Sequence, residues 1–186
     1  MELMEVIKNR RSVREYTSAP LDRETIEKLL EAAVHAPSGM NIQNWAFGVI
    51  TDPARLKDYS DKVKAELMKH VDEWEWLSRY KEMISDPNYH VFYHAPALVV
   101  IYSKSFGTLG EINCCLAAEN LMLAACDMGL GTCWIGFATE LLNQPEMKKE
   151  LGVPEEYTAV APIIVGHPAG DVPEVPRNAP EVLFMI

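Results

Sequence analysis

The chain has 186 residues, of which 48% are hydrophobic, so it is long enough to form one domain with a substantial core. Its formal net charge of −10 argues against a nucleic-acid partner, because binding to phosphate backbones requires a basic face. Neither a signal peptide nor an apolar run of membrane-spanning length is recognised, so we expect a cytoplasmic protein.

Residues 2–9 predict a short helix that leads directly into a basic segment. Three guanidinium groups and a hydroxyl follow within five residues, on Arg10, Arg11, Ser12 and Arg14. Cations at the end of a helix are one explanation, because they meet the negative end of its dipole. A phosphate site is the other, because Arg forks pair with phosphate oxygens and Ser adds a neutral donor.

A second helix is predicted from an N-cap at Asp22 to about Ala36, where Pro37 stops it. The following loop, residues 37–44, combines a permissive Gly39 with several hydroxyl and amide side chains. These groups suit a flat ligand with polar edges, although an ordinary helix-to-strand connection explains the same composition. A strand is expected at about 45–51.

Residues 54–84 read as one amphipathic helical stretch, with Trp74 and Trp76 near its apolar face. It is either a solvated helix or a mobile cap whose aromatic rings stack on a planar substrate. Metal binding by His90 and His94 is not expected, because only a short segment before Pro96 could be helical.

The second half of the chain begins with a continuous apolar run, Ala97 to Tyr102, typical of a strand buried on both faces. Residues 106–110 read as a flexible link. The helix predicted at 111–128 is apolar nearly all round, which suggests burial against a second copy of the chain. We expect the four cysteines to be reduced, buried thiols rather than a metal site or a redox pair. They are Cys114, Cys115, Cys126 and Cys133.

Residues 129–137 end this helix and form a short extended segment, whose glycines either cap the helix or let backbone N–H groups face a ligand. Pro145 to Gly152 predicts a short helix and Ala159 to Val165 a buried strand. An irregular arm then carries Arg177. The apolar tail at 182–186 is interpreted as a strand added to a sheet, quite possibly that of a partner subunit.

Taken together, the chain resembles the FMN-dependent nitroreductase family. Four motifs in the family's order carry the resemblance, at residues 10–14, 37–45, 129–136 and 165–168. The resemblance implies an α+β fold, with a central, mainly antiparallel sheet flanked by helices. It also implies a homodimer with exchanged C-terminal arms. Residues 1–186 would form a single FMN-binding domain, with a cap or insert at 54–90 and an arm reaching the partner subunit at 167–186.

Carried over residue by residue, the resemblance places Arg10, Ser12 and Arg177 at the FMN phosphate or ribityl chain, with Arg11 beside them. Arg14 matches the cation near the flavin N1/O2 edge. The other subunit would contribute Pro37, Ser38, Gly39, Met40, Asn41 and Gln43. The ring would be faced by Trp134 and by the backbone of Ile135 and Gly136. Asn44 stands where the family often has a proline.

The function implied is transfer of two electrons from NAD(P)H through flavin N5 to nitroaromatic, quinone or similar planar acceptors. Donor and acceptor would use one pocket in turn, a ping-pong mechanism without a protein nucleophile. Two alternatives remain open. The chain could store or sense FMN without turnover, or it could carry out other flavin chemistry, such as reductive dehalogenation or flavin breakdown.

Overall fold

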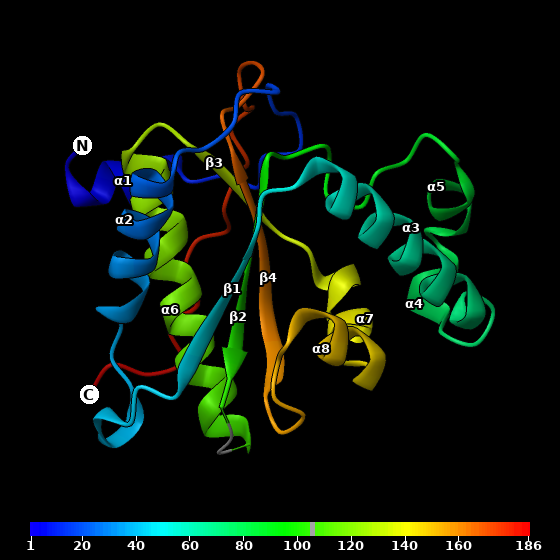
Figure 1. The fold of residues 1–186 in the computed structure, drawn as a ribbon. Coiled ribbons are helices and arrows are strands. Elements are labelled where there is room, and N and C mark those ends of the chain that lie inside the picture. Colours follow the sequence, from blue (N-terminus) through cyan, green and yellow to red (C-terminus); the bar gives the residue numbers. More distant parts are fainter. Residues whose placement is uncertain (105–106) are drawn as a thin grey trace.

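The computed structural model describes residues 1–104 and 107–186 and contains a four-stranded sheet in the order β1-β2-β4-β3 (Figure 1). Each neighbouring pair of strands is antiparallel. The strands are β1 (Trp45–Ile50), β2 (Ala97–Ser103), β3 (Gly131–Trp134) and β4 (Thr158–Gly166). The predicted α+β fold with an antiparallel central sheet is confirmed.

Helices cover both faces of the sheet (Figure 1). One face carries α1 (Leu3–Asn9), α2 (Arg23–Val34) and α6 (Gly107–Asp127). The other carries α3 (Pro53–His70), α4 (Glu75–Ser78), α5 (Lys81–Ser85), α7 (Thr139–Asn143) and α8 (Pro145–Leu151). Two single 3-10 turns, η1 (Gly39–Asn41) and η2 (Gly136–Ala138), lie next to β1 and β3 in the chain.

The central strand β2 divides the hydrophobic core into two layers. Leu98 and Val100 belong to the layer under α3 and α7, whereas Val99 and Ile101 belong to the layer under α2 and α6. Side chains of a strand alternate between its two faces, so a continuous apolar run is what a strand buried on both sides requires. Every residue of β2 is buried, as the sequence predicted.

The stretch predicted as one helix at 54–84 consists of three helices. Asp52 begins the first by accepting hydrogen bonds from the N–H groups of Ala54 and Arg55, at 2.8 and 3.4 Å. This helix, α3, ends at His70, and Trp74 is the N-cap residue of α4. No glycine or proline marks the break, which is why the periodic pattern concealed it.

The long helix α6 begins at Gly107, so residues 107–110 form its first turn rather than the predicted link; Phe106 lies outside the described residues. Its burial is also one-sided. Ala117 and Leu121 are fully buried against the sheet and α2, whereas Ile112 and Leu116 are 51% and 41% exposed. Burial on all sides is therefore not achieved within one chain.

Among the described residues, α6 is the one helix whose length and apolar composition would allow it to cross a membrane. Of its most apolar stretch, 44% is buried inside the chain. Core helices of soluble proteins meet the same criterion.

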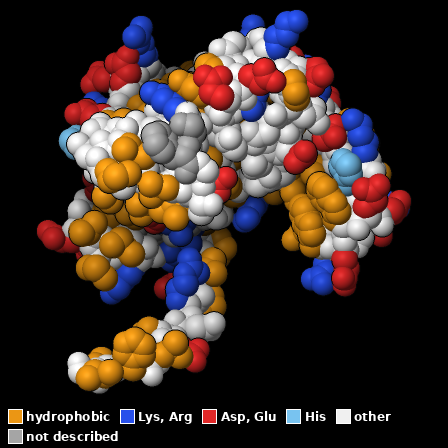
Figure 2. Space-filling model, turned by 90° about the horizontal axis from the view of Figure 1, so that it is seen from below, with side chains coloured by type: hydrophobic (Ala, Val, Ile, Leu, Met, Phe, Trp, Pro, Cys, Tyr) orange, Lys and Arg blue, Asp and Glu red, His pale blue; other side chains and the backbone are white. Residues whose placement is uncertain are grey.

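The C-terminal arm, residues 167–186, makes one isolated bridge, Tyr16 with Pro168, and then runs without regular structure. Figure 2 shows its end extending away from the body of the molecule. The terminal strand predicted at 182–186 does not form on this chain's own sheet. Leu183 and Phe184 are instead 83% and 77% exposed.

All four cysteines are free. Cys114 and Cys133 are buried as predicted. The prediction of burial is wrong for Cys115, which lies on the exposed face of α6, and Cys126 is only half-buried.

Candidate functional site

A cavity of about 470 Å³ lies between the basic segment after α1 and the C-terminal arm. We call it the arginine cavity, because its lining includes Arg10, Arg11, Arg14 and Arg177 together with Ser12. The structure therefore brings Arg177 together with Arg10, Arg11 and Ser12, which were predicted to lie at or beside the phosphate or ribityl chain, and Arg14, predicted at the flavin N1/O2 edge, lines the same cavity.

The basic segment is fixed by pairing along β3. Ser12 forms a parallel bridge with Thr132, and the N–H of Val13 donates to the Thr132 carbonyl at 2.9 Å. This close approach needs Gly131, because a Cβ at that position would lie 2.7 Å from Val13 Cβ. Ser12 and its neighbours are therefore held in extended backbone beside the sheet.

The guanidinium groups of the arginine cavity are only partly matched by protein acceptors. Arg10 Nε lies 3.6 Å from a Glu119 carboxylate oxygen, and Arg11 donates to the carbonyls of Lys8 and Arg10. Arg11 Nε is buried and has no hydrogen-bond partner. A buried N–H of a cation without an acceptor is costly. The guanidinium groups that line the cavity, together with the Ser12 hydroxyl, offer an anion several charge-assisted donors. The donors present therefore fit a phosphate group.

A second cavity, of about 550 Å³, adjoins the first at Arg14, which lines both. We call it the aromatic cavity. Its wall includes the end of β3 with Trp134, Ile135 and Gly136, and Arg14 lies 5.9 Å from the centre of the Tyr93 ring. The sequence did not predict four further lining residues, which are Tyr80, Met83, Tyr89 and Tyr93.

The backbone after β3 offers one N–H to this cavity. Ile135 has already donated its N–H to the Pro162 carbonyl at 2.8 Å. Gly136 is the first residue of η2, and the first N–H of a helical turn has no partner inside that turn. A Cβ at Gly136 would meet nothing within 4 Å, so the space beside it is open. Of the two predicted residues, Gly136 is the one placed to donate.

Cys133 lines the aromatic cavity but is a poor candidate for a nucleophile. Burial raises the pKa of its thiol, and the nearby Arg14 opposes this shift only in part. The side chain is therefore a neutral thiol at physiological pH.

The loop at 37–43 lies at the other end of the sheet. The loop precedes Trp45, which pairs with Ser103 at the end of β2. The basic segment lies beside Thr132, which pairs with Val165, and Val165 pairs with Ala97 at the start of β2. From Ala97 to Ser103, β2 advances roughly 20 Å. Within one chain, the structure does not bring together the arginine cavity and the predicted loop residues, which are Pro37, Ser38, Gly39, Met40, Asn41 and Gln43.

This loop has an unusual backbone held by polar contacts. Met40, Asn41 and Gln43 have φ angles of 52, 54 and 46°, a region that non-glycine residues seldom occupy. Gln43 donates its backbone N–H to Ser38 Oγ at 3.1 Å and its side-chain amide to Asn41 Oδ1 at 3.0 Å. The amide and hydroxyl groups are thus arranged as a rigid edge, and Met40 is 83% exposed.

A buried amide network anchors the loop to α6. Gly39 donates its N–H to Asn113 Oδ1 at 3.1 Å, and Asn113 Nδ2 donates to Asn44 Oδ1 at 2.8 Å. Asn44 Nδ2 in turn donates to Ser103 Oγ at 3.2 Å. The sequence analysis missed Asn113, although an Asn inside an otherwise apolar helix was a usable signal.

Replacing Asn113 by alanine should lower the free energy of unfolding by about 3 kcal/mol, because the Gly39 N–H and the Asn44 carbonyl oxygen would both lose a buried partner. Urea denaturation of the purified variant measures this. The matched control is Asn120→Ala on the same helix, which removes a half-buried bond to the Ala32 carbonyl and should cost about 1 kcal/mol. Equal effects of the two changes would contradict the anchoring role.

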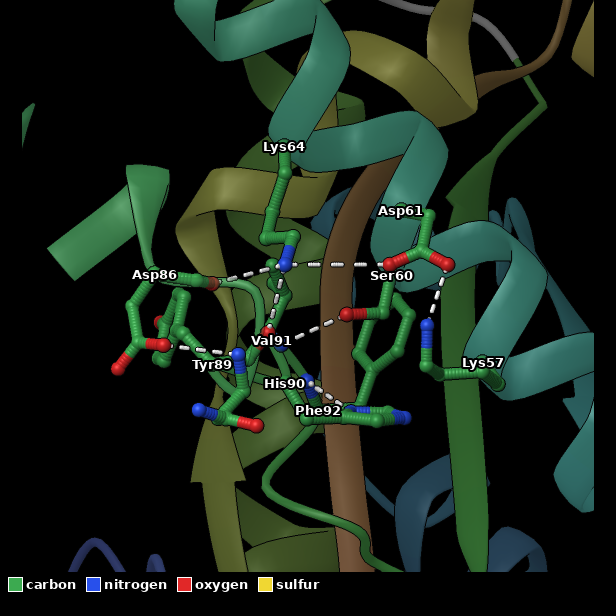
Figure 3. A network of polar contacts seen from close by, with 10 residues as sticks. Lys57, Ser60, Asp61, Lys64, Asp86, Tyr89, His90, Val91 and Phe92 are labelled. Atoms are coloured by element: carbon green, nitrogen blue, oxygen red, sulfur yellow. Dashed lines mark hydrogen bonds and ion pairs between the residues drawn. The ribbon is translucent and has the colours of Figure 1, made fainter.

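The residues at 86–92, which follow α5, are tied to α3 (Figure 3). Lys64 Nζ donates to the carbonyls of Asp86 and Tyr89 at 3.1 and 3.0 Å, and Val91 donates its N–H to Ser60 Oγ at 2.9 Å. These bonds fix the segment that presents Tyr89 to the aromatic cavity.

His90 is buried in the same network, where its Nδ1 accepts the Phe92 N–H at 3.1 Å. Burial lowers its pKa to about 4, with help from the neighbouring His94. Within the described residues, no group of three or more His, Cys, Asp or Glu side chains is placed to hold a metal ion.

Acid should therefore destabilise the fold through His90. The unfolded chain binds a proton near pH 6.5 and the folded chain only near pH 4, so stability falls as the pH decreases between these values. We expect this residue to account for about 2 kcal/mol of the loss, measured by urea denaturation from pH 7 to pH 4. His90→Gln should flatten the profile, whereas His35→Gln at an exposed site should not.

Comparisons with known proteins agree with this fold. The model of the nitroreductase family matches residues 7–167. A nitroreductase of Bacteroides fragilis, solved with bound FMN, has a TM-score of 0.85 and 28% identity, covering 100% of this chain and 98% of its own. The cofactor expected from the sequence is thus the group that this relative holds.

Two relatives differ in their named activities. A protein of Archaeoglobus fulgidus, provisionally named NADH dehydrogenase/NAD(P)H nitroreductase, is 30% identical over 90% of this chain and 86% of its own. The iodotyrosine deiodinase of Nematostella vectensis is 27% identical over 100% of this chain and 75% of its own. The extent of these matches, and the agreement with the resemblance seen in the sequence, show that the chain belongs to the nitroreductase family.

Proposed function

We propose that this protein is an FMN-dependent oxidoreductase that transfers two electrons from NAD(P)H to planar acceptors such as nitroaromatics and quinones. The observation that supports this most directly is the position of Arg14, which lines both cavities. A ligand with an anionic end and a flat ring would find hydrogen-bond donors in the arginine cavity and aromatic side chains in the aromatic cavity.

The arginine cavity is suited to hold the phosphate of FMN. Arg10, Arg11 and Arg177 would contribute guanidinium donors, and Ser12 would contribute a hydroxyl. Bidentate guanidinium contacts fix orientation as well as affinity. The ring end would then be directed toward Arg14 and the end of β3.

When bound, FMN supplies two-electron transfer between NAD(P)H and the acceptor. In this proposal Arg14 would balance the negative charge that accumulates at the N1/O2 edge of the ring. The Gly136 N–H would orient the ring at its N5 edge. The neutral thiol of Cys133 is not needed as a nucleophile.

We further propose a homodimer in which the loop at 37–43 of one subunit completes the site of the other. Three features support it: the rigid amide edge that lies far from this chain's own arginine cavity, the apolar outer face of α6, and the exposed apolar arm. In the same proposal, residues 1–186 form one domain, residues 54–90 act as a cap, and the arm docks on the partner. Four free cysteines are typical of a reducing compartment, which supports a cytoplasmic location.

The purified protein should be yellow and retain FMN through gel filtration at twice the mass of one chain. It should oxidise NADH or NADPH when 1,4-benzoquinone or a nitroarene is supplied. A yellow protein inert with both nicotinamides would favour FMN storage or sensing. A colourless monomer that ignores added FMN would contradict the proposal entirely.

A further inference from the structure

A continuous series of stacked rings leads from the cap region, residues 54–90, to the aromatic cavity. His70 stacks on Trp74 at 4.6 Å between ring centres, Trp74 on Trp76 at 5.9 Å, and Trp76 on Phe137 at 6.3 Å. Tyr80 meets Phe137 edge-on at 5.4 Å. The series starts at the end of α3 and finishes at η2, beside the end of β3.

Two of these rings are exposed on the cavity side of the molecule. Trp76 and Tyr80 are 52% and 43% exposed and both line the aromatic cavity. Figure 2 shows hydrophobic side chains gathered on the inner side of the lobe formed by the cap helices, facing a hollow. Exposed aromatic faces held in a fixed orientation are a ready surface for a flat ring, because stacking then requires little further ordering.

The charge of this cavity is one-sided. Among the described residues that line it, Arg14 is the one ionised side chain, and there is no carboxylate. Burial raises the pKa of the Tyr89 phenol, so this group is neutral and can donate a hydrogen bond. A ligand with an anionic or neutral polar group would find donors here, whereas an ammonium group would find no anion and would face Arg14.

We propose that the aromatic cavity selects flat aromatic acceptors that are neutral or anionic and rejects those that carry an ammonium group near the ring. This inference rests on the proposed function and specifies its substrate class. With FMN bound, the positive charge of Arg14 beside the flavin edge and the lack of a carboxylate among the described lining residues would set the charge preference, and Trp76 and Phe137 would supply the stacking surface.

Three ligands with the same ring test the selection: 4-nitrobenzoate, 4-nitrobenzyl alcohol and 4-nitrobenzylamine. Their dissociation constants for the oxidised holoprotein are measured by calorimetry at pH 7. The amine should bind about tenfold more weakly than the alcohol, and the benzoate at least as tightly as the alcohol. Equal affinities for the three, or tightest binding of the amine, would overturn the proposal.

Two pairs of variants test the residues. Met83→Glu places a carboxylate in the wall and should reverse the order, so that the amine binds at least tenfold more tightly than the benzoate. Met83→Gln, its uncharged match, should keep the original order. Trp76→Ala should weaken all three ligands about tenfold without changing their order, and Trp76→Phe should restore most of the affinity. An unchanged order in Met83→Glu, or unchanged affinities in Trp76→Ala, would contradict the assignment.

The outcome can be separated from failure of the proposed function. A protein that holds FMN and reduces benzoquinone but binds the three ligands equally contradicts this inference alone. A protein that binds no FMN contradicts the proposed function first. Calorimetry on the oxidised protein does not depend on turnover, so a catalytically silent flavoprotein still gives a decisive result.

Discussion

Replacing Arg11 by methionine should weaken FMN binding about a hundredfold. Methionine fills similar space but removes one guanidinium group of the arginine cavity, and with it the proposed charge-assisted contact to phosphate, worth roughly 3 kcal/mol. The dissociation constant is measured by quenching of flavin fluorescence as apoprotein is titrated into FMN.

Two further variants sharpen this test. Arg23→Met removes a guanidinium that is 92% exposed on α2 and should leave FMN affinity unchanged. Arg11→Lys keeps the charge but loses the planar fork, so its affinity should lie between those of the wild type and Arg11→Met. If Arg11→Met binds FMN as the wild type does, the arginine cavity is not the phosphate site.

Replacing Leu116 by arginine should convert the protein into a colourless species of one chain mass, 20.9 kDa. Leu116 lies on the outer face of α6, which we propose to be covered by the partner subunit. A charge buried there without a counter-charge opposes association by several kcal/mol. In the proposed dimer each site needs the loop at 37–43 of the other subunit, so loss of the dimer should also release FMN.

Light scattering and the visible spectrum, recorded on the same gel-filtration peak, measure both effects together. Met68→Arg, at a similarly exposed position of α3, is the control and should remain dimeric and yellow. A Leu116→Arg protein that is monomeric but still holds FMN would contradict the proposal of a shared site. It would still agree with the proposal that the wild type dimerises through α6.

The elements that the sequence predicted well are those with a strong local pattern. The buried run of β2 and the capped, amphipathic helix α2 each appear within two or three residues of the expected bounds. The basic segment and Arg177 were predicted as one site from the family resemblance, and the structure places them around one cavity. Their role in binding FMN stays a prediction.

What the sequence could not provide depends on contacts between distant residues. The break after His70 has no glycine or proline, and Gly107, with a φ of 50°, begins a helix where glycine usually indicates a link. The partnership of Asn44 with Asn113 joins β1 to α6, and only the folded chain reveals it. The rings of Tyr80 and Tyr89 likewise reach the aromatic cavity from the segments that follow two short helices, α4 and α5, whose turns leave no periodic signal.

The pairing of the basic segment with β3 has a consequence for how the protein is made. Ser12 is synthesised well before its bridge partner Thr132, and Tyr16 well before its partner Pro168. Local helices can form during synthesis, but contacts of such long sequence separation must wait. The arginine cavity therefore cannot form until these later segments have been made, and a chain that lacks them would carry its arginines without the enclosed cavity that we propose for phosphate.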